Sequence, residues 1–306
     1  MAAPEVTHAH SCQSWEYERT IPGIVVGVDG SRESIAALNT GAVLARRRRC
    51  PLHAVTVLSP YPSYHAIPAG DDSEHTVNEL RMSLRDSELH DIVTALEPEE
   101  DWTHEVMMGR PARELNRAAV NRGADLMIVG RKRHSAMDRV LGGETTLQVM
   151  RTSTIPVLAV DTDLEIPRTV VAAVDFSPSS ILAVKSALEF MSGSGTLYLV
   201  FVEPAPVIVP AGYSAPVDMR FPGDLVVWFR RMVADLGIQA GIIAEPVVLG
   251  GRPASAIVQF AERVGADMIA AGSHGHGRLE RFLLGSVSSG IVRNANCAVL
   301  VVPPSS

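Results

Sequence analysis

The chain has 306 residues, enough for two domains, and its 46% hydrophobic and 20% charged residues are typical of a globular protein with large cores. The net charge of −7 argues against a nucleic-acid partner, and no apolar run is long enough to cross a bilayer, which argues against a membrane partner. We expect a cytoplasmic location for two reasons. The start of the sequence is polar and does not resemble a secretory signal, and the three cysteines show no Cys-x-x-Cys spacing.

From Ile24 the first half alternates apolar runs with stretches of helical periodicity. Ile24–Val28 is a continuous valine-rich run, as in a strand buried on both faces of a parallel sheet. Asp29 follows this strand, and residues 1–19 before it are expected to form a flexible tail. Further strands are expected at Leu52–Leu58, Trp102–Met108, Leu126–Val129 and Val157–Val160, with helices at Ser34–Arg48, Glu74–Leu96, from Pro111, and at Glu144–Arg151.

Two of these helices carry patterns that bear on their surroundings. The basic run Arg46–Arg49 falls at the end of the first helix, where cations favour the negative end of the helix dipole. We therefore interpret it as a solvated helix terminus and not as a nucleic-acid or targeting patch. The long second helix is amphipathic, and one face carries Val77, Leu80, Leu84 and Ile92.

The second half repeats the order of the first. Gly251-Arg252-Pro253-Ala254 matches Gly109-Arg110-Pro111-Ala112 residue for residue, and the halves then align without a gap up to Val160 and Val302. We infer a duplication, with one domain at residues 20–163 and a second at residues 164–306. Alternating strands and helices imply right-handed crossovers, and hence an α/β fold with a doubly wound parallel sheet in each half.

A glycine-rich stretch near the end of the chain suggests an anion site. The apolar run Met268–Ala271 leads into Gly272-Ser273-His274-Gly275, and nine residues further on Gly285-Ser286-Val287-Ser288 opens a helix. Glycines let the backbone close on a ligand, and the first N–H groups of a helix point outward at the positive end of its dipole. The hydroxyls of Ser286 and Ser288 are candidate phosphate donors. The stretch lacks the lysine of a Walker loop and the spacing of the dinucleotide fingerprint.

Asp175 is the candidate acidic residue of the same site. In open parallel sheets a ligand lies beyond the carboxyl ends of the strands, where the strand order reverses. If the first and fourth strands of the second half are neighbours there, Asp175 and the Gly272 loop face one crevice. Asp175 would then bind a sugar hydroxyl or a phosphate-bound metal ion. The alternative role is a turn-former or helix cap, and spacing alone does not decide between them.

The spacing Gly272-x-x-Gly275-(nine residues)-Gly285-Ser286 resembles the G-2x-G-9x-G-[ST] motif of ATP-binding universal stress proteins. The resemblance covers the chain after its tail, as a tandem pair of such domains. It implies two five-stranded sheets of strand order 3-2-1-4-5, of the adenine nucleotide alpha hydrolase-like type. It also implies a bound adenine nucleotide, which is ATP or alternatively AMP or ADP, with Mg²⁺ accompanying the nucleotide.

The resemblance also assigns roles by position. Asp175 would lie near the ribose or the metal ion, and Val202 would offer backbone groups to adenine. The ribose and phosphates would be held by Gly272, Gly275, Gly285, Ser286, Val287 and Ser288. In the family the last strand commonly pairs with its counterpart in a dimer. We therefore expect a homodimer, or a pseudo-dimer in which Val157–Val160 pairs with Val299–Val302 within one chain.

The first half departs from the motif. Arg133 stands in place of Gly275, and Glu144 stands in place of Ser286. A carboxylate at a helix N-terminus gains about 0.3–1 kcal/mol from the dipole and would repel a phosphate. We therefore expect the second half to bind ATP and the first half to be empty or to bind weakly. The run Arg131-Lys132-Arg133 is the counterargument, because these cations would attract phosphate by charge.

Three functions fit these features. The first is a cytoplasmic stress-response regulator that binds ATP through its second domain. The second is a slow ATPase or phosphotransferase, and the third is an interaction scaffold that needs no nucleotide. We assign no catalytic residue: His274 and His276 flank Gly275, and histidines beside loop glycines are more often solvated than catalytic.

Overall fold

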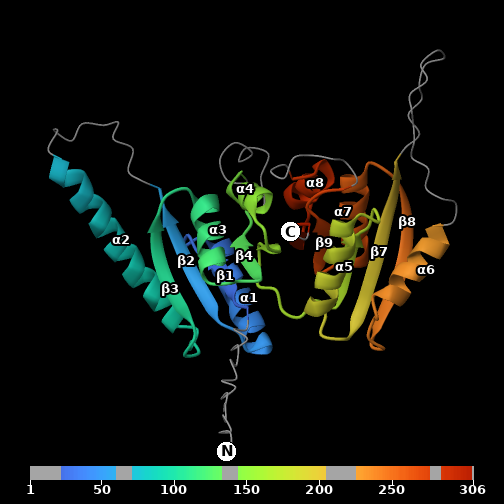
Figure 1. Ribbon diagram of the computed structural model, residues 1–306, viewed down its shortest axis with the longest axis horizontal. Coiled ribbons are helices and arrows are strands. Elements are labelled where there is room, and N and C mark those ends of the chain that lie inside the picture. Colours follow the sequence, from blue (N-terminus) through green and yellow to red (C-terminus); the bar gives the residue numbers. More distant parts are fainter. Residues whose placement is uncertain (1–21, 60–70, 133–143, 205–224, 276–283, 305–306) are drawn as a thin grey trace, which may run out of the picture.

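The computed structural model describes residues 22–59, 71–132, 144–204, 225–275 and 284–304. Within these residues ten strands form one continuous sheet, in the order β3-β2-β1-β4-β5-β10-β9-β6-β7-β8 (Figure 1). Each half contributes five neighbouring strands in the order 3-2-1-4-5. The predicted doubly wound fold and its strand order are confirmed. The expected domain bounds, 20–163 and 164–306, stay a prediction.

Each half alternates parallel strands with helices. The elements of the first half are β1 (Ile24–Gly27), α1 (Arg32–Arg48), β2 (Leu52–Leu58), α2 (Asp71–Thr94), β3 (Thr103–Met108), α3 (Pro111–Asn121), β4 (Leu126–Gly130), α4 (Glu144–Thr152) and β5 (Val157–Val160). Those of the second half are β6 (Thr169–Ala173), α5 (Pro178–Phe190), β7 (Gly195–Pro204), α6 (Leu225–Asp235), β8 (Ile242–Gly251), α7 (Pro253–Val264), β9 (Met268–Gly272), α8 (Ser286–Asn294) and β10 (Ala298–Val302).

Equivalent helices begin in the same way in the two halves. Ser31 caps α1 by accepting a hydrogen bond from the Ser34 N–H, and Ser177 caps α5 by accepting one from the Ser180 N–H. A serine cap satisfies one of the N–H groups that the first turn leaves unpaired. The first helices of both halves therefore start directly beyond the carboxyl ends of β1 and β6.

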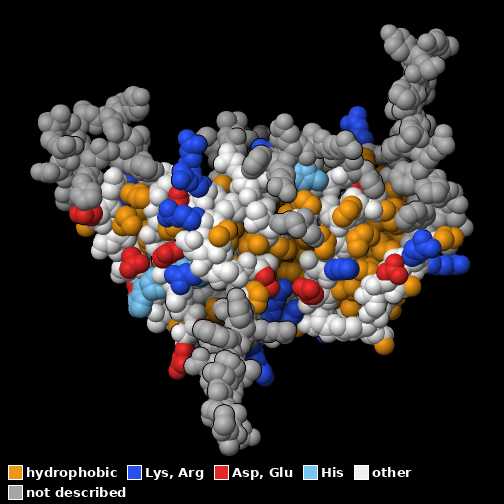
Figure 2. Space-filling view, in the orientation of Figure 1, with side chains coloured by type: hydrophobic (Ala, Val, Ile, Leu, Met, Phe, Trp, Pro, Cys, Tyr) orange, Lys and Arg blue, Asp and Glu red, His pale blue; other side chains and the backbone are white. Residues whose placement is uncertain are grey.

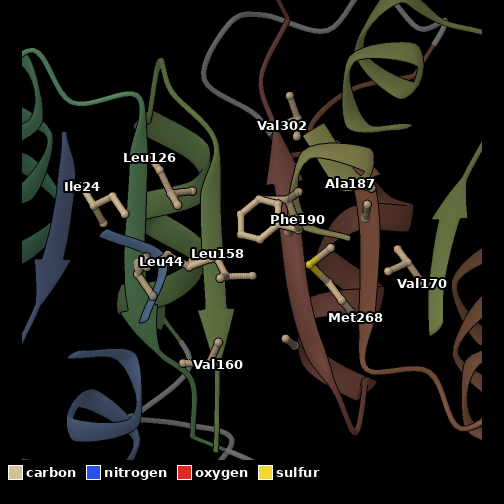
Figure 3. Close-up of a cluster of buried hydrophobic side chains, with 14 of the residues drawn as sticks. Ile24, Leu44, Leu126, Leu158, Val160, Val170, Ala187, Phe190, Met268 and Val302 are labelled. Carbon is tan, nitrogen blue, oxygen red and sulfur yellow. The ribbon is translucent and has the colours of Figure 1, made fainter. Parts of the chain in front are cut away.

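One hydrophobic core covers each face of the sheet, and both cores run through both halves. Helices α1, α2, α5 and α6 bury their apolar side chains on one face, and α3, α4, α7 and α8 bury theirs on the other. Figure 3 shows members of the first core from both halves, among them Leu158 of β5 and Phe190 of α5. Burial of apolar surface across the join therefore stabilises both halves together.

The halves are joined by β5 and β10, which pair antiparallel. Leu300 lies opposite Leu158, with Val299 opposite Ala159 and Val301 opposite Val157. All of these residues are fully buried or nearly so. The intramolecular pairing expected for Val157–Val160 and Val299–Val302 is thus confirmed, and the strand edge that would pair between two subunits is occupied within the chain.

The basic run at the end of α1 has more partners than a solvated terminus. Arg47 donates to the carbonyl oxygens of Glu189 and Phe190, at the end of α5 in the other half, at 2.7 and 2.9 Å. The Arg46 guanidinium lies 4.9 Å from the ring centroid of Trp102 and donates to carbonyls after α2. The run is a helix terminus, as predicted, but it also ties α1 to its neighbours.

The buried face of α2 differs from the predicted one. Leu80 and Leu84 are 60% and 63% exposed, whereas Leu89 and Val93 are buried. The reason is the phase of the helix: its buried and half-buried side chains form one stripe, which includes Arg81, Met82, Arg85, Leu89, Ile92 and Val93, and Leu80 and Leu84 lie on the other side of α2. The helix has 24 residues and extends about 36 Å, whereas a seven-residue strand such as β2 extends about 23 Å. The first turns of α2 therefore project beyond the sheet (Figure 1).

None of the helices in the described residues is both long enough and apolar enough to span a membrane. On the face seen in Figure 2, acidic and basic side chains are interspersed, and hydrophobic side chains reach the surface mainly over the second half.

Candidate functional site

The site predicted for the second half lies at the carboxyl ends of β6 and β9. These strands pair in parallel, although three helices and two strands separate them along the chain. Strand β7 lies on the other side of β6, so the strand order reverses between β6 and β9. Asp175 follows β6 and Gly272 ends β9. The condition under which Asp175 and the Gly272 loop share one edge of the sheet is therefore met.

The two oxygens of Asp175 have different surroundings. Oδ1 accepts a hydrogen bond from the Ser177 N–H at 2.9 Å, which is the turn-forming role. Oδ2 faces the glycine loop, because a Cβ atom built on Gly275 would lie 2.6 Å from it. The loop therefore passes close to the carboxylate, and a side chain at position 275 would have to displace the Asp175 carboxylate from its present position. Both roles considered for Asp175 are compatible with this geometry.

Gly272 is also required by a close approach. A Cβ atom here would lie 2.7 Å from Ser179 Oγ and 2.8 Å from the Ser179 carbonyl carbon, in the first turn of α5. The Ser179 hydroxyl also donates to the His274 carbonyl oxygen. The first turn of α5 is thus fixed to the start of the glycine loop.

Gly285 returns the chain to the same loop and begins α8. Its N–H donates to the Ser273 carbonyl oxygen at 2.8 Å, and Ser288 Oγ donates to the Gly272 carbonyl oxygen at 2.5 Å. Gly285 is the N-cap of α8 and has no side chain to accept from the first turn. The positive end of α8 therefore opens at the loop, with Ser286 exposed beside it.

The predicted hydroxyl donors differ in their positions. Ser286 is exposed, so its hydroxyl can reach a ligand, and Val287 next to it is half-buried. Ser288 is 5% exposed, and its hydroxyl proton is committed to Gly272. Ser288 therefore holds the loop in place.

Val202 lies further from the end of its strand than predicted. Strand β7 continues to Pro204, and Val202 pairs with Leu249 of β8 inside the ladder. The side chain of Val202 is 8% exposed.

Phe176, directly after Asp175, is a residue of this edge that the sequence pattern did not reveal. Its φ of 61° is left-handed, and the equivalent Gly30 of the first half has a φ of 80°. A non-glycine residue rarely adopts this region, and such strain is found mainly where the surroundings hold it. The ring of Phe176 packs against Phe201 and Phe229, at centroid distances of 5.8 and 5.3 Å.

The first half has a cavity at the equivalent edge. It has a volume of about 320 Å³ and is lined by Gly27, Val28, Asp29, Ser31, Glu33, Ser34, Val55, Val57, Pro111, Leu115, Val129, Gly130, Lys132, Thr145, Thr146 and Val149. Its loop is built like that of the second half, because Thr146 Oγ1 donates to the Gly130 carbonyl oxygen as Ser288 does to Gly272. Glu144 is the first residue of α4, as predicted, but its side chain and Arg133 lie outside the described residues.

Three charged residues line this cavity, namely Asp29, Glu33 and Lys132. Burial alone would raise the pKa of Asp29, but hydrogen bonds from Ser31 and the charge of Lys132 lower that pKa below its usual value. Asp29 is therefore an ionised carboxylate at neutral pH, and it is set against the exposed cation of Lys132.

Arg131 does not serve the role considered for it. Its side chain is buried and donates to the carbonyl oxygens of Val292, Ala295 and Cys297, all in the second half. It also lies 3.6 Å from Asp161 Oδ2. The expectation that Arg131 attracts phosphate in the first half is therefore wrong, because the join between the halves takes up its guanidinium.

The histidines and candidate metal ligands can be placed in part. His274 Nδ1 lies 2.8 Å from Ser273 Oγ, and His276 lies outside the described residues. Within the described residues no three His, Cys, Asp or Glu side chains are arranged to hold a metal ion.

Fold and site together define a class: a tandem doubly wound α/β protein in which the strand order reverses once in each half, with a glycine at the end of the fourth strand of each half. The model of the universal stress protein family matches residues 22–161 and again residues 167–303. The chain therefore belongs to the universal stress protein family.

Similar proteins agree with this assignment. A universal stress protein of Mycobacterium tuberculosis is 26% identical over 301 residues, which cover 91% of this chain and 96% of the relative. A universal stress protein of Methanocaldococcus jannaschii is 35% identical over 137 residues, covering 44% of this chain and 80% of the relative. The crystal structure of a universal stress protein from Archaeoglobus fulgidus has a TM-score of 0.67 at 20% identity, and the match covers 92% of this chain and 96% of that one. At this identity the structure supports the fold alone.

Proposed function

We propose that the second half of this protein binds an adenine nucleotide, with ATP as the principal ligand, and that the chain acts as a nucleotide-dependent regulator in the cytoplasm. One observation carries the proposal. The Gly272–Gly275 loop closes over Asp175, and Gly285 brings the open N-terminus of α8 to the same loop. A carboxylate suited to a ribose or a metal ion and a backbone suited to phosphates thus meet at one edge.

The residues present fit such a ligand. Backbone of α5 lies too close to Gly272 for a side chain, and a side chain at Gly275 would displace the Asp175 carboxylate, so two glycines keep the loop backbone open to a ligand. The N–H groups of the first turn of α8 and the exposed Ser286 would bind the phosphates. Asp175 would bind the ribose or the Mg²⁺ ion that accompanies the nucleotide, and bound Mg²⁺ would offset phosphate charge. Val202 would flank adenine with its backbone. AMP and ADP would use the same contacts with fewer phosphates.

The first half is proposed to bind the triphosphate weakly or not at all. Its Arg131 points to the other half, and Glu144 begins the helix where the second half has Ser286. A carboxylate at that helix end stabilises α4 and repels phosphate. The cavity of the first half still has room for a small ligand near Asp29 and Lys132. We therefore expect one tightly bound ATP per chain.

The experiment is calorimetric titration of the purified chain with Mg²⁺–ATP, together with mass spectrometry of small molecules released on denaturation. Wild-type protein should bind one ATP per chain, and ligand at 100 times the Kd should raise the unfolding free energy by about 2.7 kcal/mol. Ser286→Glu should weaken ATP binding by about tenfold or more, because it places a carboxylate beside the phosphates. Ser286→Ala, the matched control, should change affinity only a few-fold.

The alternatives give different results. A wild-type chain that binds no adenine compound and keeps its melting temperature in excess Mg²⁺–ATP would contradict the proposal and favour a nucleotide-independent scaffold. Sustained release of ADP, lost in Asp175→Ala, would favour the slow ATPase or phosphotransferase. A stoichiometry near two would overturn the assignment of a single tight site.

A further inference from the structure

Arg131 connects the loop of the first half to a helix of the second. It lies between Gly130 and Lys132, and both of these residues line the cavity of the first half. Its own side chain turns away from that cavity and is 4% exposed. Nη1 donates to the Val292 and Ala295 carbonyl oxygens at 3.1 and 2.9 Å, and Nη2 donates to that of Cys297 at 2.8 Å.

These three carbonyls belong to the end of α8 and the residues just after it. The last carbonyls of a helix have no partners within the helix, and a cation there also interacts favourably with the negative end of the dipole. Arg131 satisfies both requirements from the other half of the chain. Asp161, 6% exposed and 3.6 Å away, balances the buried charge.

The same helix carries the proposed phosphate contacts at its opposite end. Helix α8 has nine residues and is about 13 Å long, so a shift of its C-terminus moves its N-terminus as well. Ser286 at that N-terminus is exposed, and Ser288 in the first turn bonds to Gly272 of the glycine loop. One rigid element thus extends from Arg131 to the site.

The arrangement is asymmetric. The residue equivalent to Arg131 in the second half is Ser273, which is buried and bonds locally to His274. Serine is too short to reach the end of α4. The first half therefore holds α8 of the second half by a contact that the second half does not return.

We propose that Arg131 is a positioning residue for the nucleotide site of the second half, and that it couples the loop of the first half to that site through α8. This inference rests on the proposed function for the identity of the ligand. Since Gly130 and Lys132 line the first cavity, a molecule bound there contacts the loop that holds α8.

The test compares Arg131→Met with Arg46→Met in the full chain. Arg46 also donates to backbone carbonyls, but those of Leu96 and Glu97 in its own half, so it is a matched control for a lost arginine cap. Affinities for Mg²⁺–ATP and for adenosine are measured by calorimetry well below the melting temperature of each variant. Arg131→Met should weaken ATP binding by about five- to twentyfold and adenosine binding by much less, because the direct contacts proposed for α8 are with the phosphates. Arg46→Met should leave both affinities unchanged.

A second variant and a second measurement keep the test decisive. Arg131→Lys keeps the charge but not the fork of donors, so its ATP affinity should lie between those of wild type and Arg131→Met. Hydrogen exchange should rise at the amides of α8, including residues 286–289, in Arg131→Met and not in Arg46→Met. Equal loss of ATP and adenosine binding, or unchanged exchange in α8, would refute the inference. If the wild-type chain binds no adenine compound, the proposed function fails, and the exchange measurement still decides whether Arg131 holds α8.

Discussion

Replacing Gly272 by alanine tests whether the close approach of α5 to β9 builds the site. The added Cβ atom would lie 2.8 Å from the Ser179 carbonyl carbon, where ordinary contacts begin at 3.4 Å. The first turn of α5 must therefore retreat by about 0.6 Å, and it cannot do so by a rotamer change because the contact is with backbone. That movement would strain the bond from Ser179 to the His274 carbonyl and open the glycine loop.

Overpacking of this kind costs about 1–3 kcal/mol of unfolding free energy. With about 2–4 °C per kcal/mol, typical of chains of 150–250 residues, Gly272→Ala should melt several degrees below wild type. Its affinity for Mg²⁺–ATP should fall as well, because the loop no longer closes over Asp175. Differential scanning calorimetry and calorimetric titration measure the two effects.

Gly250 provides the matched control. It lies in β8, no atom lies within 4 Å of a Cβ built there, and its φ is not in the left-handed region. Gly250→Ala should therefore be neutral or stabilise by up to about 1 kcal/mol through a less flexible unfolded chain. If Gly272→Ala melts like Gly250→Ala and binds ATP normally, the close packing of α5 on β9 does not shape the site.

Two further predictions concern the core and the pH dependence of stability. Leu158→Ala, at the buried join of β5 and β10, should cost about 2–5 kcal/mol and lower the melting of both halves in one calorimetric transition; two separated transitions would contradict a shared core. Burial lowers the pKa of His53 below its usual 6.5, against the raising effect of Glu105, so the native state keeps His53 neutral. The unfolding free energy is therefore unaffected by His53 protonation above about pH 6.5. It falls as the pH drops from there towards the folded pKa, because His53 then binds a proton in the unfolded chain but not in the native one. Between about pH 7.5 and 5.5 the melting temperature of His53→Gln should therefore fall by less than that of wild type. An equal fall in both proteins would show that His53 does not cause the pH dependence of stability.

The internal repeat accounts for most of what the sequence predicted. Valine-rich runs indicate parallel strands that are buried on both faces of a sheet. Because the two halves align without a gap, each strand predicted in one half supports the prediction of the aligned strand in the other. The rule that ligands lie at carboxyl ends then places Asp175 beside Gly272. Periodicity is a weaker guide for α2, because Leu80 and Leu84 lie on its exposed face while polar residues such as Arg81 and Arg85 are half-buried on the face towards the sheet.

Arg131 and Phe176 show where sequence reasoning stops. Arg131 sits in a basic run beside a glycine, which suggests a phosphate contact, and only the pairing of β5 with β10 brings the end of α8 within its reach. Phe176 adopts a left-handed φ that its residue type disfavours, and packing against Phe201 and Phe229 offsets the strain. The contacts of Arg131 and the backbone conformation of Phe176 thus depend on segments that are distant in the sequence.

The join within one chain has a consequence for the number of sites. In a symmetric dimer of identical subunits, any residue that reaches across the interface does so twice, so both sites are held alike. Here the two partners are halves of one sequence, and Arg131 faces α8 while its counterpart Ser273 does not reach α4. The second half, whose helix α8 is held by Arg131, has the glycine loop and the hydroxyl of Ser286. The first half, whose helix α4 has no such contact from Ser273, has Glu144 in place of Ser286. Duplication therefore allows one half to specialise in holding the proposed nucleotide site of the other, as a pair of equivalent sites cannot.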